Sequence, residues 1–181
     1  MDEIWQRLER LPSAIPESEP PPSAAVLMPL YEDQAGRVRV VLIKRPDHMP
    51  THAGQIAFPG GMSTSDDSDL VATALREAWE EVGIVPEDVH VLGFLPPVQA
   101  ARTELIVAPV VGRLSSPPEL RPDPNEVDLV LEPPLEGFFV EAGWRSEDWG
   151  GHELWFFDFE EEVLWGASAR MMRQLVAAAQ G

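Results

Sequence analysis

Three glutamates, Glu77, Glu80 and Glu81, stand close together in a stretch that has the pattern of a helix. At about 100° per residue they fall on one side of that helix. Their like charges repel one another, and a hard divalent cation such as Mg²⁺, which prefers oxygen ligands, would stabilise them. A solvated acidic face is the simpler alternative. A different side of the helix carries the apolar residues expected to anchor it in the core: Val71, Ala74, Leu75, Ala78 and Val82.

The residues around this helix favour a ligand site over a plain acidic surface. The run FPGG at 58–61 precedes the helix by a short acidic loop, and its paired glycines let the backbone approach a ligand closely. Gly61 could therefore offer its carbonyl oxygen to a metal. Arg76 stands next to Glu77 and could orient the carboxylates or pair with Asp67. Taken alone, each feature has an ordinary alternative, a tight turn for FPGG and a surface ion pair for Arg76.

The composition limits the class of protein. The chain has 181 residues, a net charge of −18 and no cysteine, so we expect one domain without disulfides or thiolate chemistry. Lys44 is the only lysine and the arginines are scattered, which argues against a nucleic-acid polymer as partner. No apolar run is long enough to span a membrane, and the first residues do not resemble a signal peptide. We therefore expect a cytoplasmic protein that binds no membrane.

The hydrophobic pattern predicts an α+β fold. Residues 4–11 have the pattern of a short amphipathic helix, and a proline-rich linker follows up to residue 22. Residues 69–83 form the clearest helix, which Ser68 or Asp69 could cap and Gly83 could end. Because strands and helices alternate irregularly, we expect a mixed sheet covered by helices. Strands are predicted at 23–31, 37–45, 89–95, 104–114, 126–135 and 152–159, and a closing helix at 165–180.

Residues 61–84 resemble the Nudix box, G-x5-E-x7-R-E-U-x-E-E-x-G-U, where U is apolar. The matching residues of its second half are Arg76, Glu77, Ala78, Glu80, Glu81, Gly83 and Ile84. In the first half, 14 residues separate Gly61 from Arg76, one more than in the general pattern, and Asp67 stands in place of a glutamate. The resemblance implies a Nudix-type α/β/α sandwich with a mixed central sheet, formed by residues 23–181 after the N-terminal segment 1–22.

The extra residue is a feature of the coenzyme A pyrophosphatase-like branch, and residues 41–61 are similar to that branch's signature. Leu42, Arg45, Gly54 and the run 58–61 match it. Pro50 stands where the branch has an arginine. The segment 98–109 also lacks the glycine and the aromatic residue that the branch usually has there.

The resemblance implies roles for individual residues. Mg²⁺ or Mn²⁺ would bind Glu77, Glu80 and Glu81, with the Gly61 carbonyl as a further ligand. The catalytic set would comprise Glu77, Glu80, Arg76 and Glu126, and the general base is either a glutamate of the box or Glu126. Glu126 could instead be an additional metal ligand or an ordinary surface residue. Substrate contacts are expected from Arg45, His52, Gln55, Gly60 and Gly61. Trp79 and Trp165 are interpreted as packing residues.

The implied reaction is hydrolysis of the pyrophosphate bond of coenzyme A or its derivatives. The products would be 3′,5′-ADP and a 4′-phosphopantetheine compound. Two alternatives stay open: another nucleoside diphosphate derivative as substrate, such as ADP-ribose, a dinucleotide or a nucleotide sugar, and a non-catalytic binding module with the same fold. The expected partner is a small-molecule nucleotide substrate, bound by a monomer or a homodimer.

Overall fold

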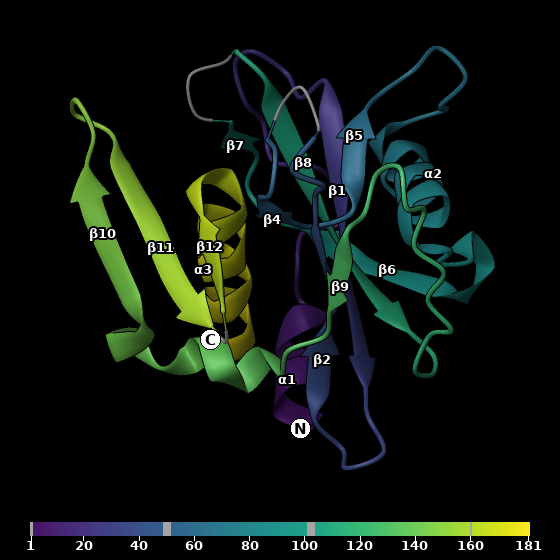
Figure 1. The fold of residues 1–181 in the computed structure, drawn as a ribbon. Helices are drawn as coiled ribbons and strands as arrows, with labels where there is room; N and C mark the ends of the chain where they lie inside the picture. Colours follow the sequence, from purple (N-terminus) through teal and green to yellow (C-terminus); the bar gives the residue numbers. More distant parts are fainter. Residues whose placement is uncertain (1, 49–51, 101–103, 160) are drawn as a thin grey trace.

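The computed structural model describes residues 2–48, 52–100, 104–159 and 161–181 (Figure 1). The helices are α1 (Asp2–Leu8), α2 (Leu70–Val82) and α3 (Gly166–Gln180), with short 3-10 turns at Pro86–Asp88, Leu135–Phe139 and Glu141–Gly143. The strands are β1 (Ala24–Glu32), β2 (Val38–Val40), β3 (Leu42–Lys44), β4 (Ile56–Ala57), β5 (Gly60–Met62), β6 (Val89–Phe94), β7 (Val98–Gln99), β8 (Ile106–Leu114), β9 (Leu129–Leu131), β10 (Trp144–Asp148), β11 (Glu153–Phe159) and β12 (Glu162–Trp165).

The central sheet is mixed, as the sequence predicts. Its order is β2-β1-β8-β6, with β5 also pairing β1 and β7 also pairing β8. β1 and β8 run parallel, with Leu27 opposite Val110, whereas the other pairs are antiparallel. Every residue of β1 except Glu32 is buried, as expected of a strand covered on both faces.

Alternate residues of β1 face two separate hydrophobic cores. Ala25 and Leu27 pack in one core with the buried face of α2, which includes Ala74 and Ala78. Val26 and its neighbours on the other face pack in a second core with α1 and α3. Because side chains alternate along a strand, one strand supports a helix layer on each side. This arrangement is the predicted α/β/α sandwich.

Helix α2 has the boundaries that its sequence dictates. The Asp69 side chain accepts a hydrogen bond from the Ala72 amide at 2.8 Å, so Asp69 is the N-cap. Gly83 ends the helix in the left-handed conformation with φ 74°, and its amide donates to the Trp79 carbonyl at 2.9 Å. These caps fix where the helix begins and ends, and the burial of Ala74 and Ala78 in the core fixes the direction of its glutamates.

The segment 37–45, predicted as one strand, is divided between two sheets. β2 pairs with β1, whereas β3 pairs with β4 and β9 in a separate three-stranded sheet. The division occurs at Val41, whose amide donates to the Pro29 carbonyl at 3.0 Å. The chain thus leaves the central sheet just before Arg45 and carries that residue toward α2.

A second antiparallel sheet, β10-β11-β12, lies beyond α3, and only its middle strand was predicted. Figure 1 shows α3 between this meander and the central sheet. The N-terminal helix ends at Leu8, earlier than predicted, and packs against α3. Arg7 Nη1 donates to the Ala179 carbonyl at 3.1 Å. Among the described residues, no helix is long and apolar enough to cross a membrane.

Candidate active site

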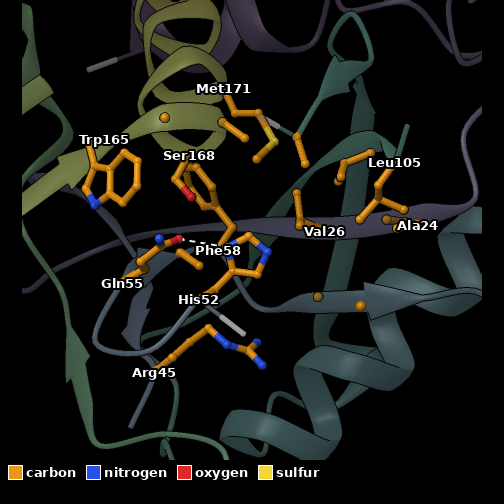
Figure 2. A pocket seen from close by; sticks show the side chains of 18 of the residues that line it. Ala24, Val26, Arg45, His52, Gln55, Phe58, Leu105, Trp165, Ser168 and Met171 are labelled. Carbon is orange, nitrogen blue, oxygen red and sulfur yellow. Dashed lines mark hydrogen bonds between the residues drawn. The ribbon is translucent and has the colours of Figure 1, made fainter. Parts of the chain in front are cut away.

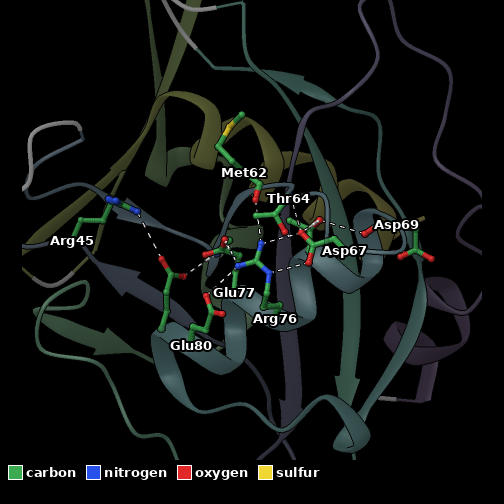
Figure 3. A network of polar contacts seen from close by, with 11 residues as sticks. Arg45, Met62, Thr64, Asp67, Asp69, Arg76, Glu77 and Glu80 are labelled. Atoms are coloured by element: carbon green, nitrogen blue, oxygen red, sulfur yellow. Dashed lines mark hydrogen bonds and ion pairs between the residues drawn. The ribbon is translucent and has the colours of Figure 1, made fainter.

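Arg76 is the centre of the polar network on α2 (Figure 3). Its Nε and Nη2 atoms donate to the two oxygens of Asp67 at 2.9 and 3.0 Å, which forms a bidentate ion pair. Its Nη1 atom donates to Glu77 at 2.8 Å and to Glu80 at 3.1 Å. One guanidinium therefore orients two carboxylates of the cluster, and the expected pairing with Asp67 is present.

Asp67 anchors the loop before α2 to the helix. Besides Arg76, it accepts hydrogen bonds from the Thr64 amide at 2.9 Å and from the hydroxyl of the fully buried Thr73 at 3.0 Å. Arg76 also donates to the Met62 carbonyl at 3.1 Å. The hydrogen bonds from Arg76, Thr64 and Thr73 hold the pKa of Asp67 well below its usual range. The charged Asp67 side chain thus connects the loop to the helix through these hydrogen bonds.

The three glutamates differ in their surroundings. The Glu80 side chain is 51% exposed and that of Glu77 15%, whereas that of Glu81 is only 1% exposed. The alternative of a plain solvated acidic face is therefore wrong for Glu81, which points into the protein. Burial raises the pKa of Glu81 to about 8 and also raises the pKa of Glu77.

Glu81 connects the helix to two neighbouring segments. It accepts a hydrogen bond from the Gly60 amide at 2.9 Å, and Arg45 Nη1 lies 3.8 Å from its other oxygen. At this length the contact with Arg45 is a loose ion pair. The Nε atom of Arg45 is buried and has no hydrogen-bond partner. The guanidinium is therefore only partly satisfied by Glu81.

The glycine pair is required by close packing. A Cβ atom on Gly60 would lie 2.4 Å from the Ala25 carbonyl oxygen, and one on Gly61 would lie 2.6 Å from the Glu77 carboxylate. Both distances are far below ordinary contact. The run FPGG thus allows β5 to lie directly beside β1 and the Glu77 carboxylate to lie directly against Gly61.

The loop 115–128 brings Glu126 toward the cluster. The amides of Arg121 and Asp123 donate to the Val82 and Glu81 carbonyls at 2.8 and 2.9 Å, so the loop is attached to the end of α2. The charge of Glu126 contributes to the raised pKa values of Glu77 and Glu81. Glu126 is half-buried, and its charge acts on both of these carboxylates.

A cavity of about 650 Å³ opens beside this cluster (Figure 2). Arg45, His52 and Gln55 line it, and so do Gly60 and Gly61. His52 Nδ1 and Gln55 Oε1 lie 2.9 Å apart, and the Gln55 carbonyl accepts from the Arg45 amide at 3.0 Å. All five residues expected to contact substrate therefore surround one space.

Residues 21–148 match the NUDIX domain. The chain belongs to the Nudix family. It is 41% identical over 162 residues to Nudix hydrolase 22, chloroplastic, of Arabidopsis thaliana, in an alignment that covers 84% of this chain and 53% of the relative. The chain thus spans about half the length of that plant protein.

A bacterial relative is covered more fully. An uncharacterized Nudix hydrolase, NudL, of Salmonella paratyphi B is 41% identical over 159 residues, which cover 84% of this chain and 80% of the relative. Among solved structures, a MutT/nudix family protein from Enterococcus faecalis has a TM-score of 0.58 at 19% identity, covering 90% of this chain and 63% of that one. At such low identity this neighbour shows the Nudix fold alone.

The carboxylates of Glu77 and Glu81 are ligands of the kind that a hard cation such as Mg²⁺ prefers. Within the described part of the chain, no three acidic or histidine side chains converge as a ready metal cage. Glu77 and Glu81 are nevertheless carboxylates withdrawn from water, and their raised pKa values show that positive charge nearby does not fully compensate them. Mg²⁺ needs only one or two protein carboxylates, since waters and substrate phosphates complete its shell. The Nudix glutamates fit such an ion.

Sequence reasoning missed one wall of the cavity. The side chains of Trp149, Leu154, Ser168 and Met171 line it from the C-terminal meander and α3, and none of them was expected to contact substrate. Trp165 lines it too and stacks on Phe156 at 6.3 Å between ring centroids.

Trp79 is 52% exposed, so it is not a core residue and can pack only at the edge of the fold. Pro50 and residues 101–103, where the sequence departs from the coenzyme A branch, lie outside the described residues.

Proposed function

We propose that this Nudix protein hydrolyses the pyrophosphate bond of coenzyme A or its derivatives, with Mg²⁺ or Mn²⁺ as cofactor. The supporting observation is the position of the segment that resembles the coenzyme A signature. Arg45 and Gly60 contact Glu81, and Gly61 lies against Glu77. Arg45, Gly60 and Gly61 also line the cavity. The segment therefore joins the acidic cluster to a space that can hold substrate.

The chain's own groups divide the work of the reaction. Glu77, Glu80 and Glu81, with the Gly61 carbonyl, would hold the ion, which supplies positive charge to the pyrophosphate and acidifies water. Arg76 keeps Glu77 and Glu80 in position through its hydrogen bonds. The partly satisfied Arg45 guanidinium is placed to pair with a substrate phosphate, since Arg is well suited to phosphate oxygens.

The general base is one of two glutamates. Glu80 is the most exposed carboxylate of the box, and it can take a proton from an attacking water. Glu126 lies outside the box on the loop that is attached to the end of α2. The two assignments differ in their test, because Glu126→Gln should reduce kcat strongly only if Glu126 is the base.

A second candidate keeps the chemistry and changes the substrate to ADP-ribose, a dinucleotide or a nucleotide sugar. The replacement of a signature arginine by Pro50 and the altered segment 98–109 favour it. The non-catalytic alternative has less support, because every glutamate of the second half of the box is present.

A substrate panel with Mg²⁺ and with Mn²⁺ tests the proposal. We expect release of 3′,5′-ADP from coenzyme A or its acyl forms, with a higher kcat/KM than for ADP-ribose or dinucleotides. Glu77→Gln should abolish the activity, whereas Glu87→Gln, an exposed position just after α2, should retain it. Absence of 3′,5′-ADP with all coenzyme A forms would refute the substrate assignment. If no compound of the panel is hydrolysed, the non-catalytic binding module would be the interpretation that is left.

The cellular setting and the assembly state remain predictions. We propose a cytoplasmic protein that is a monomer or a homodimer, although the name of the Arabidopsis relative places that protein in the chloroplast. Light scattering on the purified chain distinguishes 20.0 kDa from twice that mass. Fractionation of the source cells tests the compartment.

A further inference from the structure

One wall of the active-site cavity is built by the C-terminal part of the chain, beyond the residues that match the NUDIX domain. The opposite wall is formed by β1, β5 and β8 of the central sheet. Figure 2 shows Trp165, Ser168 and Met171 above the cavity, and Arg45 below it. We call this space the C-terminal pocket.

The C-terminal pocket is apolar except near the acidic cluster. Phe58, Val26 and Met171 are more than nine-tenths buried in its wall, and Leu105 and Trp165 are partly buried. Its volume of about 650 Å³ lies within the range of small-molecule sites. A substrate group that enters here gains free energy by removing apolar surface from water.

Full positive charge is scarce in this pocket. Arg45 is the only lysine or arginine among the described residues that line it, and Glu81 already lies 3.8 Å from its guanidinium. A phosphate monoester carries nearly two negative charges, and its transfer into an apolar space without paired cations is costly. A nucleoside that bears a 3′-phosphate is therefore a poor occupant.

Neutral hydrogen-bonding groups are available instead. The first turn of α3, at Gly166, Ala167 and Ser168, lines the pocket, and no side chain caps its amides. Such amides, the Ser168 hydroxyl and the Gln55 side chain can pair with amide groups of a ligand. The pocket thus offers apolar surface with a few neutral polar groups, which matches an uncharged amide-containing chain.

We propose that the C-terminal pocket binds the pantetheine arm and the acyl group of the substrate, and leaves the 3′-phosphoadenosine half outside. The identity of this arm rests on the proposed function. The two phosphates then lie at the mouth of the pocket, between Arg45 and the carboxylates of α2. The C-terminal wall, and Ala167 in particular, becomes a determinant of specificity.

Binding of an uncharged probe tests this without catalysis. S-octanoyl-pantetheine is titrated into the protein in EDTA by calorimetry, and S-acetyl-pantetheine is compared with it. We expect the octanoyl form to bind more tightly, by up to about fourfold for each added methylene that is buried. Adenosine 3′,5′-bisphosphate should not displace it. Equal affinities, no binding, or displacement by the bisphosphate would overturn the proposal.

A matched pair of variants locates the probe. Ala167→Phe places a ring in the pocket, whereas Ala177→Phe adds the same ring to the exposed face of the same helix. We expect at least a tenfold loss of octanoyl-probe affinity for the first and no change for the second. Equal affinity in a folded Ala167→Phe protein would contradict the proposal. If that variant does not fold, the chain-length comparison on the unaltered protein still decides.

The outcomes separate the two proposals. Binding of the probe with no hydrolysis of any coenzyme A form would refute the proposed reaction and keep the pocket assignment. Hydrolysis of coenzyme A without probe binding would keep the reaction and refute the pocket assignment.

Discussion

Replacing Gly61 by alanine should damage catalysis much more than folding. The added Cβ would lie 2.6 Å from the Glu77 carboxylate, whereas carbon atoms in favourable contact are about 3.5–4.0 Å apart. The carboxylate must therefore move by about 1 Å, and a misplacement of that size can cost about 100-fold in rate. The clash involves the far end of a side chain, so the fold itself can adjust.

Gly60→Ala is the matched comparison. Its Cβ would meet backbone, 2.4 Å from the Ala25 carbonyl oxygen and 2.6 Å from the Val26 Cα atom. Neither atom can move without disturbing β1, so we expect a loss of about 1–3 kcal/mol in stability. For a domain of this size, each kcal/mol lowers Tm by about 2–4 °C.

Two measurements on both variants test this reasoning. kcat/KM is measured with the best substrate of the panel, and Tm by differential scanning calorimetry. Gly61→Ala should lose about 100-fold in kcat/KM while Tm stays within about 2 °C of the parent. Unchanged kcat/KM in Gly61→Ala, or a fall in Tm as large as that of Gly60→Ala, would refute the assignment of Glu77 and Gly61 to one crowded site.

Three further predictions concern single groups. Burial raises the pKa of Glu81 from 4.5 to about 8, so the folded state favours the protonated carboxyl, and in EDTA stability should fall as the pH rises from 4.5 to about 8. In Glu81→Gln, Tm should fall much less over this pH range. A fall as steep as that of the parent would contradict the assignment of the effect to Glu81. Tyr31 is the only tyrosine, and burial and its hydrogen bond to Glu132 raise its pKa above 10. Absorbance should show its ionisation only well above pH 10, and stability should decline there for the parent but not for Tyr31→Phe. Asp69→Ala should cost about 1 kcal/mol in urea unfolding through loss of the N-cap, whereas Ser68→Ala should cost little.

Local patterns predicted α2 well because the residues that determine its position and its ends are close together in the sequence. The apolar spacing, the Asp69 cap and the terminal Gly83 all act within the helix or one turn beyond it. The burial of Glu81 was not predictable in the same way. It depends on Gly60 of β5 and on the loop 115–128, whose Asp123 amide donates to the Glu81 carbonyl at 2.9 Å.

Pairing between strands that are far apart in the sequence accounts for the other elements that were predicted incorrectly. The run 37–45 is a uniform strand by composition, and only its pairing with β1 and then with β9 divides it at Val41. β10 and β12 are short segments with exposed positions, and they form because β11 lies between them. Helical spacing and the resemblance both indicated the residues of the acidic cluster, but neither indicated the apolar wall opposite it.

The packing of α1 on α3 has a mechanical consequence. The hydrogen bond from Arg7 to Ala179 joins residues 172 positions apart. A pulling force applied through α1 would reach α3 through this contact, and it would reach the central sheet through Trp5, which donates to Glu32 of β1 at 3.4 Å. Since α3 also carries Ser168 and Met171, tension on the first helix would act on one wall of the C-terminal pocket. Helix α1 is thus mechanically coupled to the cavity that lies beside the acidic cluster of α2.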